Sequence, residues 1–251
     1  MGTRHLVIVY HDGEYKLAQF GQWDGYPEGQ GKVVLKFLAN PANLTKLIPN
    51  LDRLYTPSEA EWAGLNAKVG ELKSVADERI SKIYSGEVKL TQDETLQVVD
   101  ESRDPSKRVC PSLSRGTGAA ILDIIANADK PIPVQNKLEF VADIVFCEWT
   151  YVIDVDAGVL EVYAASRPVL SGTRFHELDS VHTRDGGQGD ITDGKPWAPS
   201  LVGKWPLSNL PSETVFLQDI KSAIGDREAQ TSTSGKDQAG GRGKKGVDEK
   251  G

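Results

Sequence analysis

The stretch HLVIVYHDGEYKLAQF, residues 5–20, decides the fold. Its two segments, rich in β-branched and aromatic residues, lie on either side of Asp12-Gly13, a strong signal for a two-residue hairpin turn. The chain is therefore predicted to begin with a β-hairpin. A second hairpin is predicted at residues 146–165, FCEWTYVIDVDAGVLEVYAA, where the turn DAG separates two more segments of this kind.

Helices are predicted between and after the two hairpins. They are expected over residues 31–39, across most of residues 41–103, over residues 116–128 and over residues 212–224. Thr56 is predicted to cap a helix within the second of these ranges, since a proline and then a glutamate follow it at suitable positions. The last helix is predicted to be capped by Ser212 and to end at Gly225.

This order of elements predicts an α+β fold with an antiparallel β-sheet or sheets and helical layers, because strands and helices do not alternate one by one. An αββα sandwich is one arrangement that fits it. Residues 1–225 are expected to form a single globular domain. Residues 226–251, in which Val247 is the one large apolar residue, are expected to form a disordered polar tail.

Charge and cysteine content narrow the function. The 251 residues carry a net charge of −7 and a pI of about 5.2, so we expect no nucleic-acid binding, because phosphate contacts need a basic surface. The apolar run at the N-terminus is too short for a membrane span, and no membrane contact is expected. Cys110 and Cys147 lie far apart and are expected to be reduced thiols of a cytoplasmic protein, with Cys147 buried and inert.

The sequence has no complete motif for catalysis or cofactor binding. Neither GxSxG nor HExxH occurs, and no cofactor is expected. The histidines lack the spacing of zinc ligands, so they are expected at the surface or on edge strands and no metal site is predicted. They are His5, His11, His176 and His182.

The segment GQWDGYPEGQG, residues 21–31, follows the first hairpin and precedes a predicted helix. One interpretation is a rigid structural corner in which Trp23 and Tyr26 pack on the sheet edge. The other is a ligand-binding loop, in which Trp23 stacks on the ligand and glycine N–H groups bind an anionic group. The predicted ligand-binding residues are Gln19, Gln22, Trp23, Asp24, Tyr26, Gly29 and Gly31, and the expected partner is an unidentified small molecule or protein.

Residues 4–31, RHLVIVYHDGEYKLAQFGQWDGYPEGQG, resemble the opening of a family of uncharacterised proteins from fungi and some bacteria and phages, with a GQWDGYPxGQG motif. SLSRGTGAAIL at residues 112–122 and FCEWTYVIDVDAGVLEVY at residues 146–163 resemble the same family, and LSNLPSETVFL near residue 208 does so more weakly. The family pattern implies an acidic residue where this chain has Gly116. The resemblance implies a fold more than an activity.

The order of hairpins and helices is also similar to that of the N-terminal-nucleophile hydrolases, which form a four-layer sandwich. In those enzymes the first residue of the mature chain is the nucleophile and its own amine is the base. Thr3 is the candidate here, with Arg4 nearby for orientation, and the mechanism requires a chain that begins at Thr3. A hydrolase that uses carboxylates such as Asp24 and Glu148 is a third hypothesis.

The sequence therefore favours a cytoplasmic ligand-binding or interaction module that uses the loop at residues 19–31. The alternative is an amidohydrolase of the N-terminal-nucleophile type, intact or degenerate.

Overall fold

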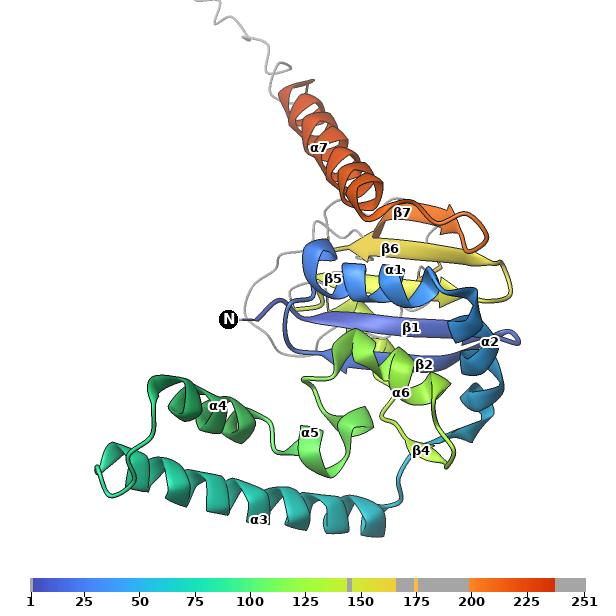
Figure 1. Cartoon of the computed structure of the whole chain (residues 1–251). Helices are drawn as coiled ribbons and strands as arrows, with labels where there is room; N and C mark the ends of the chain where they lie inside the picture. The colour runs from blue at the N-terminus through green and yellow to red at the C-terminus, as the bar shows by residue number, and fades with distance from the viewer. Residues whose placement is uncertain (1, 144–145, 166–173, 176–198, 238–251) are drawn as a thin grey trace, which may run out of the picture.

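Two β-hairpins lie side by side in the main sheet of the protein. The computed structural model describes residues 2–143, 146–165, 174–175 and 199–237. Five strands form a sheet in the order β2-β1-β5-β6-β7 (Figure 1). Their bounds are His5–His11 (β1), Glu14–Gly21 (β2), Trp149–Asp154 (β5), Val159–Ala164 (β6) and Ser200–Pro206 (β7).

The α+β class predicted from the sequence is confirmed, but the sheet is mixed rather than antiparallel. Strands β1 and β5 are parallel, with His5 opposite Trp149 and Tyr10 opposite Asp154, and the other neighbours are antiparallel. Each of the two strands opens a hairpin, and the long connection between the hairpins returns to the same end of the sheet before β5 begins. Sequence patterns place strands but do not choose their neighbours across such a connection.

The αββα sandwich needs two large sheets packed face to face, and the described residues give it no support. They form the five-stranded sheet and a two-stranded parallel sheet of β3 (Leu54–Tyr55) and β4 (Ile132–Pro133).

Both predicted hairpins are confirmed. At the first turn, Asp12 and Gly13 have φ angles of 53° and 75°, the positive values that a tight two-residue turn requires. At the second, Gly158 has a φ of 65°. Strand β7, which pairs with β6, was not predicted, because it follows a stretch with many glycines, prolines and aspartates.

Helices cover one face of the sheet, and the larger hydrophobic core lies between these helices and the sheet (Figure 1). The helices are α1 (Lys32–Leu38), α2 (Pro41–Asn50) and α6 (Ile121–Ala126). Short helical turns extend this layer: η1 (Pro27–Gly31), η2 (Leu51–Arg53) and η4 (Gly118–Ala120). Val7 and Ile153 from the strands pack with Leu122 and Ile125 from α6, all fully buried.

The opposite face of the sheet carries a smaller hydrophobic cluster. Leu6 and Ile8 of β1 pack there with Val152 of β5, beneath the turn η5 (Leu138–Ala142) and Phe175. The strands therefore alternate between two buried faces, as expected for a sheet covered on both sides.

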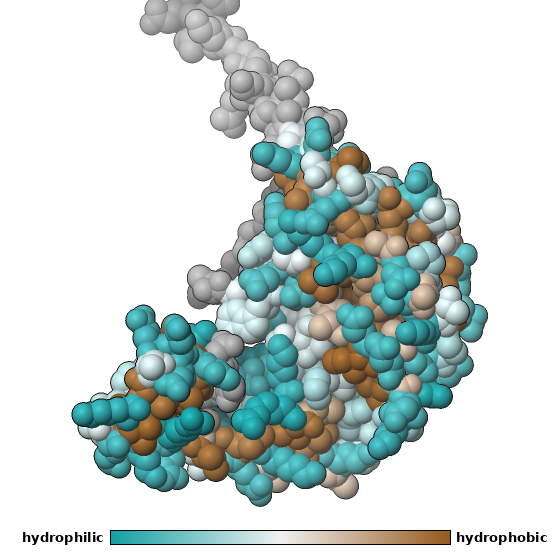
Figure 2. All heavy atoms as spheres, viewed as in Figure 1, coloured by the Kyte–Doolittle hydropathy of each residue, from teal (hydrophilic) through white to brown (hydrophobic). Residues whose placement is uncertain are grey.

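Two helices extend away from the sheet as an arm. They are α3 (Glu59–Tyr84) and α4 (Gln92–Arg103), followed by the short α5 (Ser106–Val109) and η3 (Pro111–Leu113). The surface is hollowed where the arm leaves the rest of the molecule (Figure 2). The predicted cap Thr56 is wrong: Ser58 caps α3 in a reciprocal pair with Glu61, because the chain stays extended through Pro57 and the helix begins later.

The last helix, α7 (Glu213–Asp237), packs against β7. The predicted cap is confirmed, since Oγ of Ser212 accepts a hydrogen bond from the N–H of Val215 at 3.4 Å. The predicted end at Gly225 is wrong, because one glycine costs only about 1 kcal/mol and does not stop a helix between good helix formers. Of the predicted tail, residues 238–251 lie outside the described residues.

Candidate functional site

The loop between β2 and α1, at the end of the sheet where the N-terminus lies, contacts a second loop that precedes α6 (Figure 1). The N–H of Gln22 donates to the carbonyl of Arg115 at 2.8 Å, and the N–H of Ala119 donates to Oε1 of Gln30 at 2.8 Å. Gly118, with a φ of 51°, leaves no room for a side chain beside Gln30. The two segments GQWDGYPEGQG and SLSRGTGAAIL are thus joined by hydrogen bonds.

The first loop closes on itself through backbone hydrogen bonds. The N–H of Gln30 donates to the carbonyl of Asp24 at 2.8 Å, and the N–H of Gly29 donates to the carbonyl of Tyr26 at 2.9 Å. Asp24 has a φ of 54°, in the left-handed region. A Cβ at Gly29 would lie 2.2 Å from the Asp24 carbonyl oxygen, so the turn requires glycine there. It continues as the π-helical turn η1 into α1.

A buried tyrosine of the sheet holds this loop from below. The hydroxyl of Tyr151, on β5, donates to the carbonyl of Gly25 at 2.7 Å. Burial raises the pKa of Tyr151 well above its ordinary value, so the hydroxyl keeps its proton. Gly31 lies against the rings of Tyr151 and Phe216, where an added Cβ would come within 3.0 and 3.2 Å of them.

Three of the predicted ligand-binding residues lie together at the surface. Trp23 and Tyr26 are 45% and 41% exposed, and Asp24 between them is exposed as well. The hydroxyl of Tyr26 donates to Oδ1 of Asp24 at 3.2 Å, and the charge of Asp24 raises the pKa of Tyr26. These three residues are called the loop surface below.

The other predicted ligand-binding residues serve the loop itself. The N–H groups of Gly29 and Gly31 both donate to the Tyr26 carbonyl, so they are not aimed at an anion as predicted. Gln19 is only 4% exposed, and its Nε2 donates to the carbonyls of Phe20 and Ser114. Gln22 is half-buried and binds the second loop through its N–H.

His5 lies buried under the loop, and the prediction of a surface or edge-strand histidine is wrong for it. Its side chain is fully buried, and neither ring nitrogen has a hydrogen-bond partner among the described residues. Gly21 and Gly25 press against the imidazole, which leaves no room for a Cβ at either position. Burial lowers the pKa of His5 to about 4, while the backbone of Thr3 and the charge of Asp24 oppose this more weakly.

The predicted nucleophile Thr3 also lies beside the loop. Its carbonyl accepts a hydrogen bond from the N–H of Gly25 at 2.9 Å, and its side chain is half-buried. Gly2 packs so closely on the ring of Trp23 that an added Cβ would lie 2.3 Å from it. Arg4 places its guanidinium 4.6 Å from the centre of the Phe146 ring.

Gly116, where the family resemblance implies an acidic residue, faces the carboxylate of Asp104. An added Cβ would lie 2.7 Å from Oδ2 of Asp104, which accepts hydrogen bonds from the hydroxyl of Ser114 at 2.5 Å and the N–H of Gly116 at 3.0 Å. Partial burial alone would raise the pKa of Asp104, but the hydrogen bonds from Ser106, Ser114 and Gly116 lower it. One carboxylate already occupies this position, supplied by another segment.

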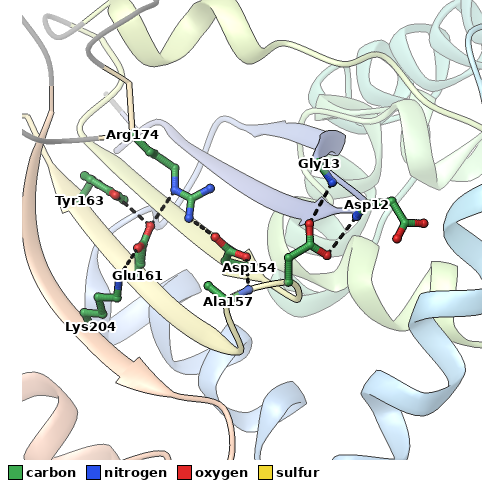
Figure 3. Close-up of polar contacts among 9 residues, drawn as sticks. Asp12, Gly13, Asp154, Ala157, Glu161, Tyr163, Arg174 and Lys204 are labelled. Carbon is green, nitrogen blue, oxygen red and sulfur yellow. Dashed lines mark hydrogen bonds and ion pairs between the residues drawn. The ribbon is translucent and has the colours of Figure 1, made fainter.

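A second polar cluster lies on the face of the sheet that helices α1, α2 and α6 do not cover (Figure 3). Arg174 bridges Asp154 and Glu161, which are buried on β5 and β6. Glu161 also accepts hydrogen bonds from Tyr163 at 2.8 Å and Lys204 at 2.9 Å. Burial alone would raise the pKa of Glu161, but these partners lower it. Both carboxylates are therefore paired with positive charges. These ion pairs connect Arg174 to β5 and β6, and Lys204 of β7 to Glu161 of β6.

Sequence reasoning missed this cluster, although its signal was present. Asp154 is the last residue of one apolar strand of the second hairpin, and Glu161 lies inside the other. A charged residue at an inward position of a strand needs a buried partner.

The two hairpin turns meet at a group of possible metal ligands, which lie within 4.8 Å of one another: His11, Asp12 and Asp156. Asp156 accepts hydrogen bonds from the N–H groups of Asp12 and Gly13 at 3.0 and 2.9 Å (Figure 3). It also binds Nδ1 of His11 at 3.0 Å. These hydrogen bonds hold the two turns together, and they explain why the three side chains lie close to one another without a metal ion. His176 and His182 lie outside the described residues.

Cys147 is buried, as predicted, and burial raises the pKa of its thiol to about 12. Its sulfur contacts the hydroxyl of Thr150 at 3.5 Å. A thiol with so high a pKa is a poor nucleophile at neutral pH.

No protein-family model matches this chain, and neither a curated protein nor a solved structure matches it significantly. The likeness to the GQWDGYPxGQG family therefore stays a prediction. Among the described residues, no helix combines the length and apolar character needed to cross a membrane.

The burial of His5 predicts a loss of stability in mild acid. The folded pKa of about 4 lies below the ordinary 6.5, so the unfolded chain binds this proton more readily. Above pH 6.5 the imidazole of His5 is neutral in both states, and the folded state keeps its full stability. As the pH falls from 6.5 toward 4, the unfolded chain takes up the proton first, and the free energy of unfolding decreases. From pH 7 to pH 5 we expect a loss of about 2 kcal/mol, measured by urea denaturation. His5→Leu should remove most of this slope; an equal slope in both proteins would contradict the assignment.

The contact of Gly116 with Asp104 predicts that an acidic residue is unfavourable there. Gly116→Asp and Gly116→Asn impose nearly the same steric strain, but only aspartate adds a negative charge beside Asp104. At pH 7 we expect the aspartate variant to be less stable than the asparagine variant by about 1 kcal/mol, from unit charges about 4 Å apart in a largely hydrated setting. Equal urea midpoints for the two variants would show that the charge has no effect.

Proposed function

We propose that this protein is a ligand-binding or interaction module, and that its contact surface is the loop surface of Trp23, Asp24 and Tyr26. One observation carries the proposal: two large aromatic side chains are exposed on a loop whose backbone is held by hydrogen bonds to itself, to β5 and to the second loop. The rigid corner and the ligand-binding loop, two interpretations of residues 21–31, are then the same structure, because the corner holds Trp23, Asp24 and Tyr26 at the surface.

A rigid loop with exposed aromatic rings suits binding for energetic reasons. Tryptophan and tyrosine provide much of the energy in many interfaces, since they bury a large area and lose little side-chain entropy. Because the loop is ordered before binding, less conformational entropy is lost when a partner docks. The hydroxyl of Tyr26 and the carboxylate of Asp24 supply a polar pair between the rings.

The charges on the loop restrict the partner. Asp24 and Glu28 are both exposed, which favours a protein or small molecule that offers hydrogen-bond donors or positive charge and disfavours nucleic-acid phosphate. The free thiols Cys110 and Cys147 support a cytoplasmic location.

One observation favours the alternative, an amidohydrolase of the N-terminal-nucleophile type. Thr3 lies just before β1 and beside the loop surface, because its carbonyl accepts the N–H of Gly25. A substrate bound on the loop would therefore lie close to the amine of a chain that began at Thr3.

Replacement of Trp23 and Tyr26 by alanine should abolish binding and leave the fold intact, because both rings are exposed. The chain is purified from the cells that produce it naturally, and its native mass is compared with that of the double variant. We expect the wild type to carry added mass that the variant loses. Val215→Ala, an exposed substitution on α7, is the control and should keep it. No added mass in the wild type, or equal added mass in the double variant, would contradict the proposal.

The denatured mass of the same sample tests the alternative. A binding module needs no N-terminal processing to act, so we expect a mass that includes residue 2. A mass that corresponds to a start at Thr3 would favour the hydrolase instead, since only then does Thr3 carry a free amine.

A further inference from the structure

The loop surface carries negative charge that the chain does not balance. Asp24 and Glu28 are both exposed, and neither forms an ion pair with any residue that the structure describes. The carboxylate of Asp24 accepts a hydrogen bond from the hydroxyl of Tyr26 at 3.2 Å. His5 beneath the loop adds no positive charge at pH 7, because burial lowers its pKa to about 4. The loop therefore offers two carboxylates to a cation from outside.

The basic residues of neighbouring segments have other positions or partners. Lys32, which follows the loop at the start of α1, pairs with Glu213 of α7. Arg4 places its guanidinium 4.6 Å from the centre of the Phe146 ring. Arg115, on the second loop, is exposed and forms no ion pair within the described part of the chain. The negative charge of the loop surface is therefore available to a binding partner.

The two aromatic rings are held beside this charge. Tyr26 touches the carboxylate of Asp24 through its hydroxyl, and Trp23 directly precedes Asp24 in the chain. The backbone of Gly2 lies against the ring of Trp23. Tryptophan and tyrosine rings attract cations to their faces, tryptophan most strongly. The loop thus combines the two kinds of group that bind an organic cation, an anion and aromatic rings.

We propose that the loop surface binds an arginine side chain of a partner protein, with the guanidinium paired with Asp24 and lying against the rings of Trp23 and Tyr26. This inference rests on the proposed function, because it names the partner of the same surface.

A guanidinium suits this surface better than other cations do. Its flat face stacks on aromatic rings while its N–H groups donate to a carboxylate in the same plane. The ammonium group of lysine is a compact charge that is more strongly hydrated, so it loses more when it leaves water for an aromatic ring. A quaternary ammonium group attracts the rings but has no N–H to donate to Asp24.

The arginine is expected to belong to a protein rather than to a free small molecule. An exposed ion pair and an exposed cation–π contact are each weak, so a lone guanidinium binds with a dissociation constant of about 1 to 10 mM. Stable binding needs further contacts, which the rest of a polypeptide can supply. Val33, just after the loop in α1, is 39% exposed and provides apolar area for such contacts.

An NMR titration of the full chain tests the proposal. The probe is a short glycine peptide with one central arginine, compared at constant ionic strength with the same peptide carrying lysine or citrulline. Citrulline replaces the guanidinium by a neutral urea group of similar shape. We expect the arginine peptide to shift the indole N–H signal of Trp23 and the backbone N–H signals of residues 22–26 in a saturable way. The lysine peptide should bind about threefold more weakly and the citrulline peptide about tenfold more weakly.

A matched pair of variants tests the role of Asp24. Asp24→Asn removes the charge but keeps the turn, because asparagine also tolerates a positive φ. It should weaken binding of the arginine peptide about three- to fivefold. Asp52→Asn is the control: Asp52 is exposed, and its charge acts on Lys16 near the turn of the first hairpin, at the other end of β2. This variant should bind like the wild type, and both should keep the circular dichroism spectrum of the wild type.

Equal affinity for the arginine and citrulline peptides, or for the arginine and lysine peptides, would overturn the proposal. An equal loss of affinity in Asp24→Asn and Asp52→Asn would do so too, because the effect would then belong to the net charge of the chain. Failure of this inference is distinguishable from failure of the proposed function. If the arginine peptide causes no saturable shift, but the natural sample carries added mass that the Trp23 and Tyr26 double variant loses, the loop surface binds a partner of other chemistry. An added mass of small-molecule size would overturn the protein partner.

Discussion

The hydrogen bond from the buried hydroxyl of Tyr151 to the carbonyl of Gly25 fixes the loop on which the candidate site depends. A buried hydroxyl without a partner costs roughly 1–3 kcal/mol, so both groups favour the one loop conformation that joins them. The carbonyl can approach the sheet only because Gly25 and Gly31 lack side chains where the chain passes His5 and Tyr151. The same contact joins the two hairpins, whose strands β1 and β5 pair side by side, since the loop follows the first hairpin and Tyr151 belongs to the second.

Once the backbone of the loop is held in this way, its side chains are what remains for other molecules. The N–H groups of Gly29, Gln30 and Gly31 all donate to carbonyls of the same turn rather than toward the solvent. The rings of Trp23 and Tyr26 stay exposed in this geometry, while Gly25 between them and Pro27 after them are buried.

Local signals in the sequence were sufficient for the hairpins and for the position of the loop. The turn at Asp12-Gly13 and the apolar segments around it act over a few residues, so they can be recognised without the fold. The parallel pairing of β1 and β5 and the burial of His5 depend on contacts between distant segments, and no local pattern reports them. Gly31 is an example of what sequence alone does not give. The sequence predicts that this glycine binds a ligand, whereas the structure shows that its lack of a side chain leaves room for the ring of Tyr151.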